Sequence, residues 1–253
     1  GKEGVRVRLN INQELNEMYQ VQWEYCRDDK SFLSLNKDTP VVRYMPTNRA
    51  PAPIKVPYPV KILLAWANPE DLDTLDVHSE IDAVKGAMAQ FIEEGKVVIE
   101  ELPNVSPTSL VSKVRQNPPH IFHFIGHGGL LPNGGGGLAL DNGRKSHVLL
   151  DGGRMLRLFQ GDDTKLIILS ACKSSASSGQ AENGGSSEAF MGLAPKLVWG
   201  GLPAVVAMQT DLPNEAAQPF MNTLYQFLAL GQPLDTAVTE ARIGLDFAIF
   251  DRP

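Results

Sequence analysis

The chain contains very little cysteine: Cys26 and Cys172 are the two cysteines among 253 residues. This number is too small for a disulfide scaffold, and the sequence holds no Cys-x-x-Cys pair. Free thiols are typical of a reducing compartment, so we expect a cytoplasmic protein.

Long apolar runs are also missing. The longest, residues 165–172, has the length of a buried strand and falls far short of the roughly 20 residues of a membrane span. A secretion signal would appear as a basic stretch followed by an apolar one, and the sequence contains no such pattern. The sequence starts with Gly1 rather than methionine, which we interpret as a sign of excision from a longer protein.

Positive charge is not concentrated anywhere in the sequence. The 23 Lys and Arg residues are scattered and are outnumbered by 29 Asp and Glu residues, for a net charge of −6. Phosphate binding needs a dense basic field, so we expect no directly bound nucleic acid. The hydrophobic fraction of 43% suffices for a large core in one domain or two small ones.

Proline divides the sequence into two parts. Residues 1–50 alternate in short stretches that predict edge strands, and five prolines then fall between Pro46 and Pro59. Each proline ring fixes φ and removes a backbone donor, which predicts a stiff connector. We therefore expect an N-terminal segment with this connector over residues 1–57 and the main domain over 58–253.

From residue 60 onward, nearly continuous apolar strands alternate with helical patterns. This alternation predicts an α/β fold, a sandwich with a mostly parallel central sheet covered by helices on both faces. Asp151 is expected to cap a short helix, and the Ser- and Gly-rich residues 173–187 to form a mobile loop. We expect strands at 61–66, 96–102, 120–125, 165–171 and 204–208, a hairpin at 138–150, and helices at 79–94, 106–114, 214–229 and 233–246.

Two reactive side chains follow neighbouring strands of this predicted sheet. His127 comes just after the third strand and Cys172 just after the fourth. The carboxyl ends of parallel strands open on one edge, and adjacent strands lie about 4.8 Å apart, so the two could meet there. A thiol with a pKa near 8.5 is only slightly ionised at neutral pH, and an imidazole is suited to deprotonate it.

Glycines surround the histidine, at positions 126, 128 and 129. Backbone without Cβ lets a substrate approach closely, and the N–H groups of Gly128 and Cys172 are the natural donors to an oxyanion. Taken singly, each residue is better explained by structure: the cysteine as a buried residue that fills core space, and the histidine as a hydrogen-bonded surface residue. Together, on paired strand ends with glycines around both, the catalytic interpretation gains weight.

The motifs around both residues resemble those of a known family. Phe122-His-Phe-Ile-Gly-His-Gly128 and Leu166-Ile-Ile-Leu-Ser-Ala-Cys172 are similar to the HFxGHG and LxACxS signatures of CHAT domains, relatives of caspases and separase. The resemblance extends over nearly the whole chain. It includes Gln22-Trp-Glu-Tyr25, Phe32-Leu-Ser-Leu35, Pro40-Val-Val-Arg43, Leu75–Ile81 and Gly200–Val206.

The resemblance implies a caspase-like three-layer α/β/α sandwich and a cysteine endopeptidase that cleaves selected protein targets. His127 would be the catalytic histidine and Cys172 the nucleophile, and no cofactor is needed. Such proteins usually act as effectors controlled by a sensor or regulatory domain or partner, which suggests bacterial signalling or antiviral defence. The rival interpretations are a catalytically silent protease-fold interaction module and another thiol enzyme, such as an acyltransferase or amidase.

The resemblance also implies where the side chain before the scissile bond would bind. In caspase-like folds this S1 pocket uses the residue two before the cysteine, here Ser170, and the loop after the next strand, here residues 209–212. Ser170 departs from the acidic residue usual in metacaspases and separase, and Asp211 could replace the lost charge. As an alternative, Asp211 is a turn or cap residue ahead of a helix.

The remaining polar candidates are better explained by structure than by chemistry. Strand alternation sends His120 and His123 to opposite faces, which argues against a zinc site that they would share with His127 and Cys172. Asp141 fits a turn. Gly134–Gly137 lacks the pattern of a phosphate loop and is expected to form a flexible flap. We expect Cys26 to be buried.

Overall fold

A computed structural model of the chain describes residues 5–11, 16–19, 21–45, 56–159, 161, 163–170, 172–173, 186–209 and 212–250. The chain divides into two compact units, each assembled from separate stretches of sequence. The first consists of Gly1–Pro46, His78–Phe91 and Asn214–Pro253, and the second of Thr47–Val77 and Ile92–Pro213. The domain boundary expected at residue 57 stays a prediction.

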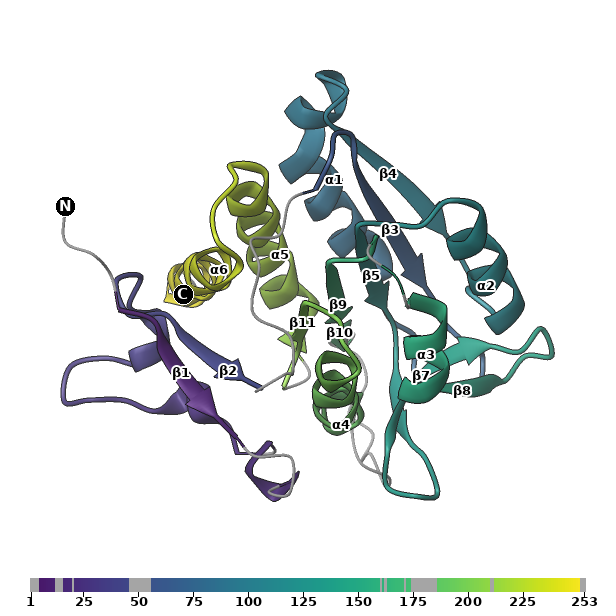
Figure 1. Cartoon of the computed structure of the whole chain (residues 1–253), viewed down its shortest axis with the longest axis horizontal. Coiled ribbons are helices and arrows are strands. Elements are labelled where there is room, and N and C mark those ends of the chain that lie inside the picture. Colours follow the sequence, from purple (N-terminus) through teal and green to yellow (C-terminus); the bar gives the residue numbers. More distant parts are fainter. Residues whose placement is uncertain are drawn as a thin grey trace. The chain divides into compact units, whose positions relative to one another are not determined.

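The second unit is built on a five-stranded parallel sheet (Figure 1), which confirms the predicted α/β fold with a mostly parallel central sheet. Its strand order is β11-β9-β5-β3-β4. Along the chain, the sheet grows to one side of β3 and then to the other, so the order reverses between β3 and β5. The strands are β3 (Val60–Trp66), β4 (Val97–Leu102), β5 (Ile121–Ile125), β9 (Leu166–Ser170) and β11 (Ala204–Ala207).

Both faces of this sheet are buried. On one face Leu63, Phe122 and Ile167 stand side by side in register and belong to one apolar cluster. Side chains of the opposite face, such as Leu64 and Ile168, have no exposed surface either. Burial on both faces explains why the strands are nearly continuous in apolar residues. Helices α2 (Pro107–Gln116), α3 (Gly152–Phe159) and α4 (Ser186–Trp199) contribute to the cluster.

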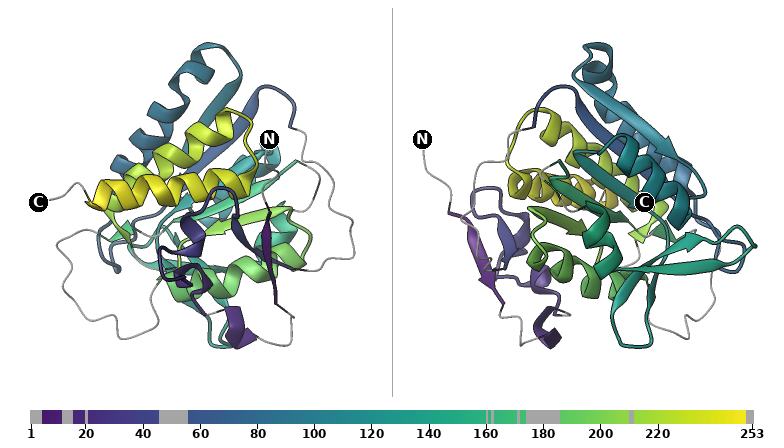
Figure 2. Two further views of the ribbon diagram at one scale, coloured as in Figure 1. Left: turned by 90° about the vertical axis from the view of Figure 1, so that its left-hand side faces the viewer. Right: turned by 45° about the vertical axis from the view of Figure 1, so that its right-hand side comes forward.

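A smaller antiparallel sheet follows β5, in the order β6-β7-β8. Its strands are β6 (Gly128–Leu130), β7 (Gly136–Asp141) and β8 (His147–Asp151), and the right-hand view of Figure 2 shows it beside the main sheet. The predicted hairpin is confirmed, since β7 pairs with β8. Asp141 Oδ1 accepts from the N–H of Gly143 in the turn, and Asp151 Oδ1 accepts from the N–H of Arg154 at the start of α3, as expected of a turn and a cap residue.

Two expectations in this region are wrong. Gly136 and Gly137 do not belong to a flexible flap: both are buried in β7, and a Cβ on Gly136 would lie 1.8 Å from the backbone oxygen of Ala189 in α4. The loop expected over residues 173–187 is also too long, because α4 begins at Ser186. We did not predict α4, whose interior Gly192 and Pro195 weaken the helical signal.

The close approach of β7 and α4 gives a stability prediction. Gly136→Ala should lower the free energy of unfolding by about 3 kcal/mol, because the methyl group meets backbone that must move. Gly192→Ala is the matched control from the facing helix: its Cβ would lie 3.4 Å from the nitrogen of Gly136, an ordinary contact. Alanine in a helix should then raise stability by about 0.5–1 kcal/mol. Denaturant titration of both variants measures the two effects, and equal stability would contradict the packing described.

The first unit contains the two-stranded parallel sheet of β1 (Val7–Asn10) and β2 (Val41–Tyr44). Helix α6 (Leu234–Phe250) packs on α5 (Asn214–Ala229) and also contacts β2 and the turn η3 (Leu33–Leu35). The two ends of the chain therefore share this unit. The unit also holds most of α1 (Val77–Glu93), with α5 (Asn214–Ala229), α6 (Leu234–Phe250), η1 (Asn16–Tyr19), η2 (Trp23–Tyr25) and η3 (Leu33–Leu35).

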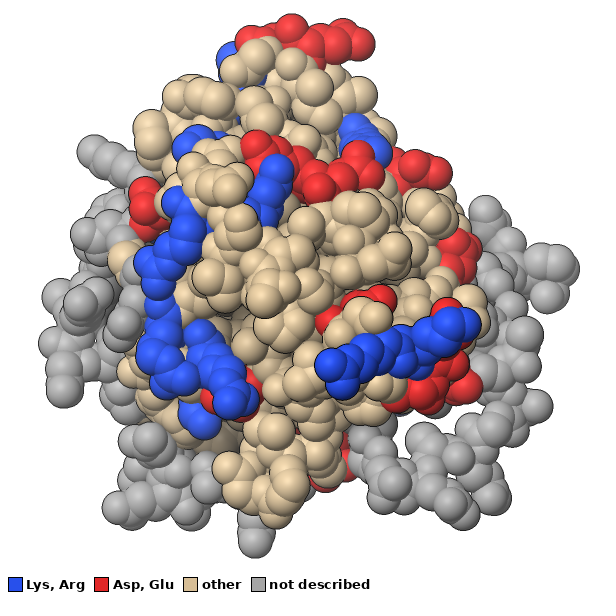
Figure 3. Space-filling model, turned by 90° about the vertical axis from the view of Figure 1, so that its right-hand side faces the viewer, with Lys and Arg blue, Asp and Glu red and all other residues tan. Residues whose placement is uncertain are grey.

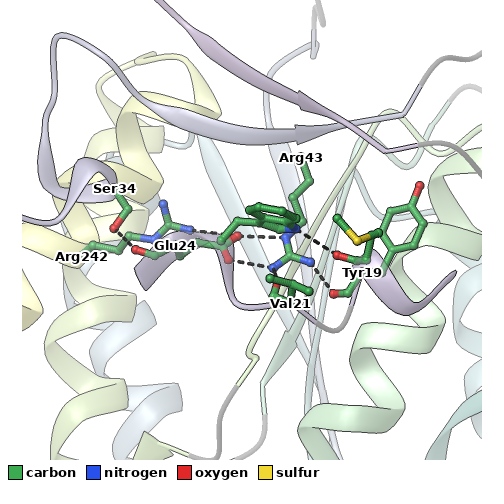
Figure 4. Close-up of polar contacts among 8 residues, drawn as sticks. Tyr19, Val21, Glu24, Ser34, Arg43 and Arg242 are labelled. Atoms are coloured by element: carbon green, nitrogen blue, oxygen red, sulfur yellow. Dashed lines mark hydrogen bonds and ion pairs between the residues drawn. The ribbon is translucent and has the colours of Figure 1, made fainter. Parts of the chain in front are cut away.

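A charged network holds the N-terminal segment together (Figure 4). Arg43 donates to both carboxylate oxygens of Glu24, at 3.0 and 2.7 Å, and to the carbonyl of Val21 at 2.8 Å. Ser34 donates to the carbonyl of Glu24 at 2.6 Å, and Arg242 of α6 lies 3.9 Å from the carboxylate. The pKa of Arg242 is lowered by burial, while Glu24 acts to raise it. Glu24, Ser34 and Arg43 all lie in the N-terminal motifs identified in the sequence, so these motifs have a structural role.

Cys26 is exposed, so the expectation that it is buried was wrong. Its carbonyl accepts from the N–H of Leu33 at 2.8 Å, which places it in a surface turn of the N-terminal segment. A lone cysteine gives no periodic pattern from which its side-chain direction could be read.

Candidate active site

The carboxyl ends of three neighbouring strands are tied together by backbone hydrogen bonds. Ala67, just after β3, donates to the carbonyl of Ile125 at 3.3 Å, and Gly126, just after β5, donates to the carbonyl of Ser170 at 3.0 Å. The loops that follow β3, β5 and β9 therefore start from one fixed edge. This edge includes the point where the strand order reverses, which is where α/β sheets usually bind their ligands.

His127 points one ring nitrogen at a backbone carbonyl of the β3 loop. Its Nε2 lies 2.7 Å from the carbonyl oxygen of Asp73. A carbonyl can only accept a hydrogen bond, so Nε2 must carry the proton in the neutral ring. The other nitrogen, Nδ1, then has a free lone pair and is the basic atom of the imidazole.

The carbonyl of Asp73 is held in place by a clamp within its own loop. Asn68 Nδ2 donates to the carbonyl of Leu75, and Asn68 Oδ1 accepts from the N–H of Leu75, both at 3.2 Å. Inside this clamp, Leu72 donates to the carbonyl of Pro69 at 3.1 Å. One amide side chain therefore closes the loop around the carbonyl that faces His127.

The same loop is held to the β7–β8 hairpin by hydrogen bonds to Asp71 and by one ion pair. Asp71 accepts from the backbone N–H of His147 at 3.2 Å and lies 3.0 Å from its Nδ1. Lys145 pairs with Glu70 at 3.1 Å. Desolvation acts to raise the pKa of Asp71, but the hydrogen bonds from His147 outweigh it, so the pKa lies below its usual value. Asp71 is therefore ionised at neutral pH and can hold this contact.

The basic nitrogen of His127 faces the start of helix α4. Ser186 Oγ lies 3.5 Å from Nδ1, at the upper limit of a hydrogen bond. The backbone beside the histidine is packed against the same helix: a Cβ on Gly128 would lie 2.7 Å from the carbonyl oxygen of Ser186. Glycine is needed at position 128 for this close approach.

Backbone pairing relates Cys172 to His127. Ile125 and Ser170 stand opposite each other at the ends of β5 and β9, and each of the two reactive residues lies two positions further along its own chain. Cys172 begins β10 (Cys172–Lys173), which pairs in parallel with β12 (Leu212–Pro213). Because His127 and Cys172 each lie two residues after the paired Ile125 and Ser170, both backbones reach the same edge of the sheet. Contact between the two side chains stays a prediction.

The N–H of Gly128 points away from its partner strand. Ala139 in β7 donates to the carbonyl of His127 at 2.9 Å, which identifies Gly128 and Leu138 as a pair without mutual hydrogen bonds. In such a pair the backbone N–H and C=O groups are directed outward from the ladder. This orientation is compatible with the expected role of Gly128 as an oxyanion donor, which stays a prediction.

Comparison with known proteins identifies the family. The family model named CHAT domain matches residues 2–246 of the sequence, nearly the whole chain. The chain belongs to the CHAT domain family. CHAT domains have a caspase-like protease fold, in agreement with the resemblance seen in the sequence. No curated protein matches the chain.

In this CHAT domain, Ser170, which is expected to line the S1 pocket, is the last residue of β9. Ser170 is fully buried, and its hydroxyl donates to Met208 Sδ at 3.6 Å. Gln209 Oε1 is buried and meets no hydrogen-bond partner among the described residues. Asp211 lies outside the described residues. Substrate binding by Ser170 and Asp211 stays a prediction.

Two further histidines of the CHAT domain, His120 and His123, are buried. His120 Nδ1 accepts from the backbone N–H of Lys61 at 3.0 Å, and burial lowers the pKa of His120. His123 is fully buried in β5. The part of the chain that the structure describes contains no group of three or more His, Cys, Asp and Glu residues that could hold a metal ion.

The sequence predicts dispersed basic residues on the surface of the CHAT domain and no membrane-spanning segment. Over the face drawn in Figure 3, some Lys and Arg residues lie beside Asp and Glu, and others run together down the left of the view, next to a broad uncharged area. None of the helices in the described residues is long and apolar enough to cross a membrane.

Sequence reasoning missed three participants of the site. The carbonyl of Asp73 and its clamp by Asn68 could not be found, because a backbone carbonyl leaves no residue signature. Ser186 fell inside the stretch expected to be a loop. The Asn68–Pro69 pair gave the nearest available signal, since asparagine before proline is typical of turns.

Proposed function

We propose that the protein is a cysteine endopeptidase in which Cys172 is the nucleophile and His127 transfers protons. The hydrogen bond between His127 Nε2 and the carbonyl of Asp73 carries the proposal. It fixes the tautomer in which Nδ1 is the base, and it would stabilise the imidazolium that forms when Nδ1 takes up a proton. The position of His127 at a strand end, with Nδ1 left unprotonated, favours proton transfer over packing alone.

The proposed reaction has two halves. Nδ1 removes the proton from the thiol of Cys172, and the sulfur attacks the carbonyl carbon of the scissile bond. The resulting oxyanion accepts hydrogen bonds from the N–H groups of Gly128 and Cys172. The imidazolium then protonates the leaving amine, the C–N bond breaks, and a thioester remains. Water, deprotonated by Nδ1, attacks the thioester, releasing the carboxylic acid product and the thiol.

We also propose a biological setting. CHAT family membership supports cleavage of selected protein targets under the control of a sensor or regulatory partner, as in a bacterial defence or signalling system. The scattered charge favours a protein over a nucleic acid as the bound partner. A sequence with two cysteines and no Cys-x-x-Cys pair is compatible with a cytoplasmic location.

The two cysteines allow a test with an internal control. Wild-type protein is treated with iodoacetamide or with a set of peptidyl chloromethyl ketones, and the modified peptides are mapped by mass spectrometry. Exposed Cys26 should react with iodoacetamide, whereas the peptidyl reagents should modify Cys172 selectively because they must first bind as substrates do. A proteome-derived peptide library, incubated with the same protein, should yield new termini with a common residue before the cut. A silent interaction module would show neither result, and an acyltransferase or amidase would react at Cys172 without cutting the library.

The Asn68 clamp should act through the rate of the chemical step. In Asn68→Ala the loop loses both hydrogen bonds to Leu75, and misplacement of the Asp73 carbonyl should lower kcat by roughly 10- to 100-fold with little change in KM. Glu70→Gln is the control on the same loop, because an exposed ion pair contributes only about 0–1 kcal/mol. Steady-state kinetics on one library-derived peptide compare the two variants. Equal kcat values would show that the clamp does not position the carbonyl.

A further inference from the structure

Strand β6 presents an outward-facing edge next to the candidate active site. Among the described residues, β6 is the terminal strand of the β6-β7-β8 sheet. At one end of the strand, Ala139 donates to the carbonyl of His127, as described above. At the other end, Leu131 donates to the carbonyl of Gly135 at 2.7 Å, which identifies Leu130 and Gly136 as a second pair without mutual hydrogen bonds. Gly128 and Leu130 therefore both direct their N–H and C=O groups away from β7.

This edge differs from the face of the strand that helix α4 covers. The position where Gly128 would carry a side chain points at Ser186 and Ala189, perpendicular to its N–H and C=O groups. Leu130 is 38% exposed, and Gly128 and Gly129 are partly exposed. A strand edge with outward N–H and C=O groups is a template on which an extended peptide can add as a further strand.

We propose that the edge of β6 binds the primed side of the substrate, the residues after the scissile bond, as an added parallel strand. This inference rests on the proposed protease function. The leaving amine belongs to the first primed residue and must reach His127 to be protonated, and β6 begins one residue after His127. Ser170, proposed for the S1 pocket, is the last residue of β9, whereas β6 continues the chain from His127 after β5. The primed residues therefore leave toward β6.

Parallel pairing fixes which groups meet. The N–H of Gly128 contacts the scissile carbonyl of residue P1. Two residues later, P2′ donates its N–H to the carbonyl of Gly128 and accepts from the N–H of Leu130. The N–H groups of P1′ and P3′ point away from β6. The chain beyond P2′ continues toward a hollow of about 270 Å³ at the end of β6, lined by Leu131, Pro132, Asn133, Asp151 and Lys196.

The protein variant that tests this contact is Leu130→Pro. Proline removes the N–H that would bind P2′ and, because that N–H points away from β7, leaves the β6–β7 ladder intact. Leu130→Ala is the control that keeps the N–H and removes the side chain. A peptide cleaved by wild type is made in two forms, one with four primed residues and one with aminomethylcoumarin in their place. Leu130→Pro should lower kcat/KM on the long peptide about 3- to 10-fold, the worth of one hydrogen bond, and leave the coumarin substrate unchanged.

The substrate provides an independent test. N-methylation of the P2′ amide should lower wild-type kcat/KM by a similar factor, whereas N-methylation at P3′ should have no effect. Equal losses at both amides, or equal kinetics of Leu130→Pro and Leu130→Ala on the long peptide, would overturn the β6 contact while leaving the protease assignment intact. A wild-type protein that cleaves no library peptide would overturn the protease assignment itself, and this inference with it. Unchanged turnover of the coumarin substrate shows that Leu130→Pro is folded.

Discussion

Replacing Cys172 with alanine is expected to abolish peptide cleavage, with a loss in kcat on the order of 10³-fold or more. The variant lacks the atom that would form the thioester. Binding of the substrate should persist, because the contacts proposed for the P1 residue and for β6 do not use the sulfur. A substrate peptide should therefore bind the variant and remain uncut.

Cys26→Ala is the matched control for this experiment. Cys26 is exposed in the first unit. Its replacement should leave cleavage and labelling of Cys172 unchanged. Mass spectrometry of the library digests reports cleavage, and fluorescence anisotropy of a labelled substrate peptide reports binding. Cleavage that survives in Cys172→Ala and disappears in Cys26→Ala would refute the assigned nucleophile.

Replacing His127 with alanine should lower the cleavage rate by about 10²- to 10⁴-fold at neutral pH, the usual contribution of a general base and acid. The labelling rate of Cys172 by iodoacetamide should fall as well, because less of the thiol is ionised without its base. This second loss should shrink as the pH is raised past about 8.5, where a cysteine ionises unaided. Cleavage should recover less, since the leaving amine still lacks its acid.

The labelling rate of Cys26 in the same sample provides the reference for this pH series. Its pH dependence should be identical in wild type and His127→Ala. If the labelling rate of Cys172 also followed one curve in both proteins, His127 would not be its base, and the hydrogen bond to Asp73 would have to serve another purpose.

The sequence predicted the fold well where burial dictates the pattern. The five central strands are apolar on both faces, so they appear as continuous runs, and four helices were placed within a few residues of their observed positions. Helix α4 was missed because Gly192 and Pro195 interrupt its pattern. The prediction that Cys26 is buried was wrong, because an isolated residue in an irregular segment has no periodicity to interpret.

The candidate site was predictable only in its side chains. The positions of His127 and Cys172 follow from strand ends on one edge, an argument that needs nothing beyond the parallel sheet. The Asp73 carbonyl and the outward edge of β6 are made of backbone, which every residue possesses. Such features are specified by register and by loop closure, and these depend on contacts between residues far apart in the chain, such as Asn68 with Leu75 or Gly136 with Ala189.

The assembly of the first unit from both ends of the chain limits how the protein can be shortened. A fragment starting after the proline-rich stretch would lack Glu24 and Arg43, and would strip α6 of its contacts with β2 and η3. The guanidinium of Arg242 would lose the carboxylate beside it. The N-terminal segment is thus a structural part of the first unit, and shortened versions of the protein should keep both ends of the chain.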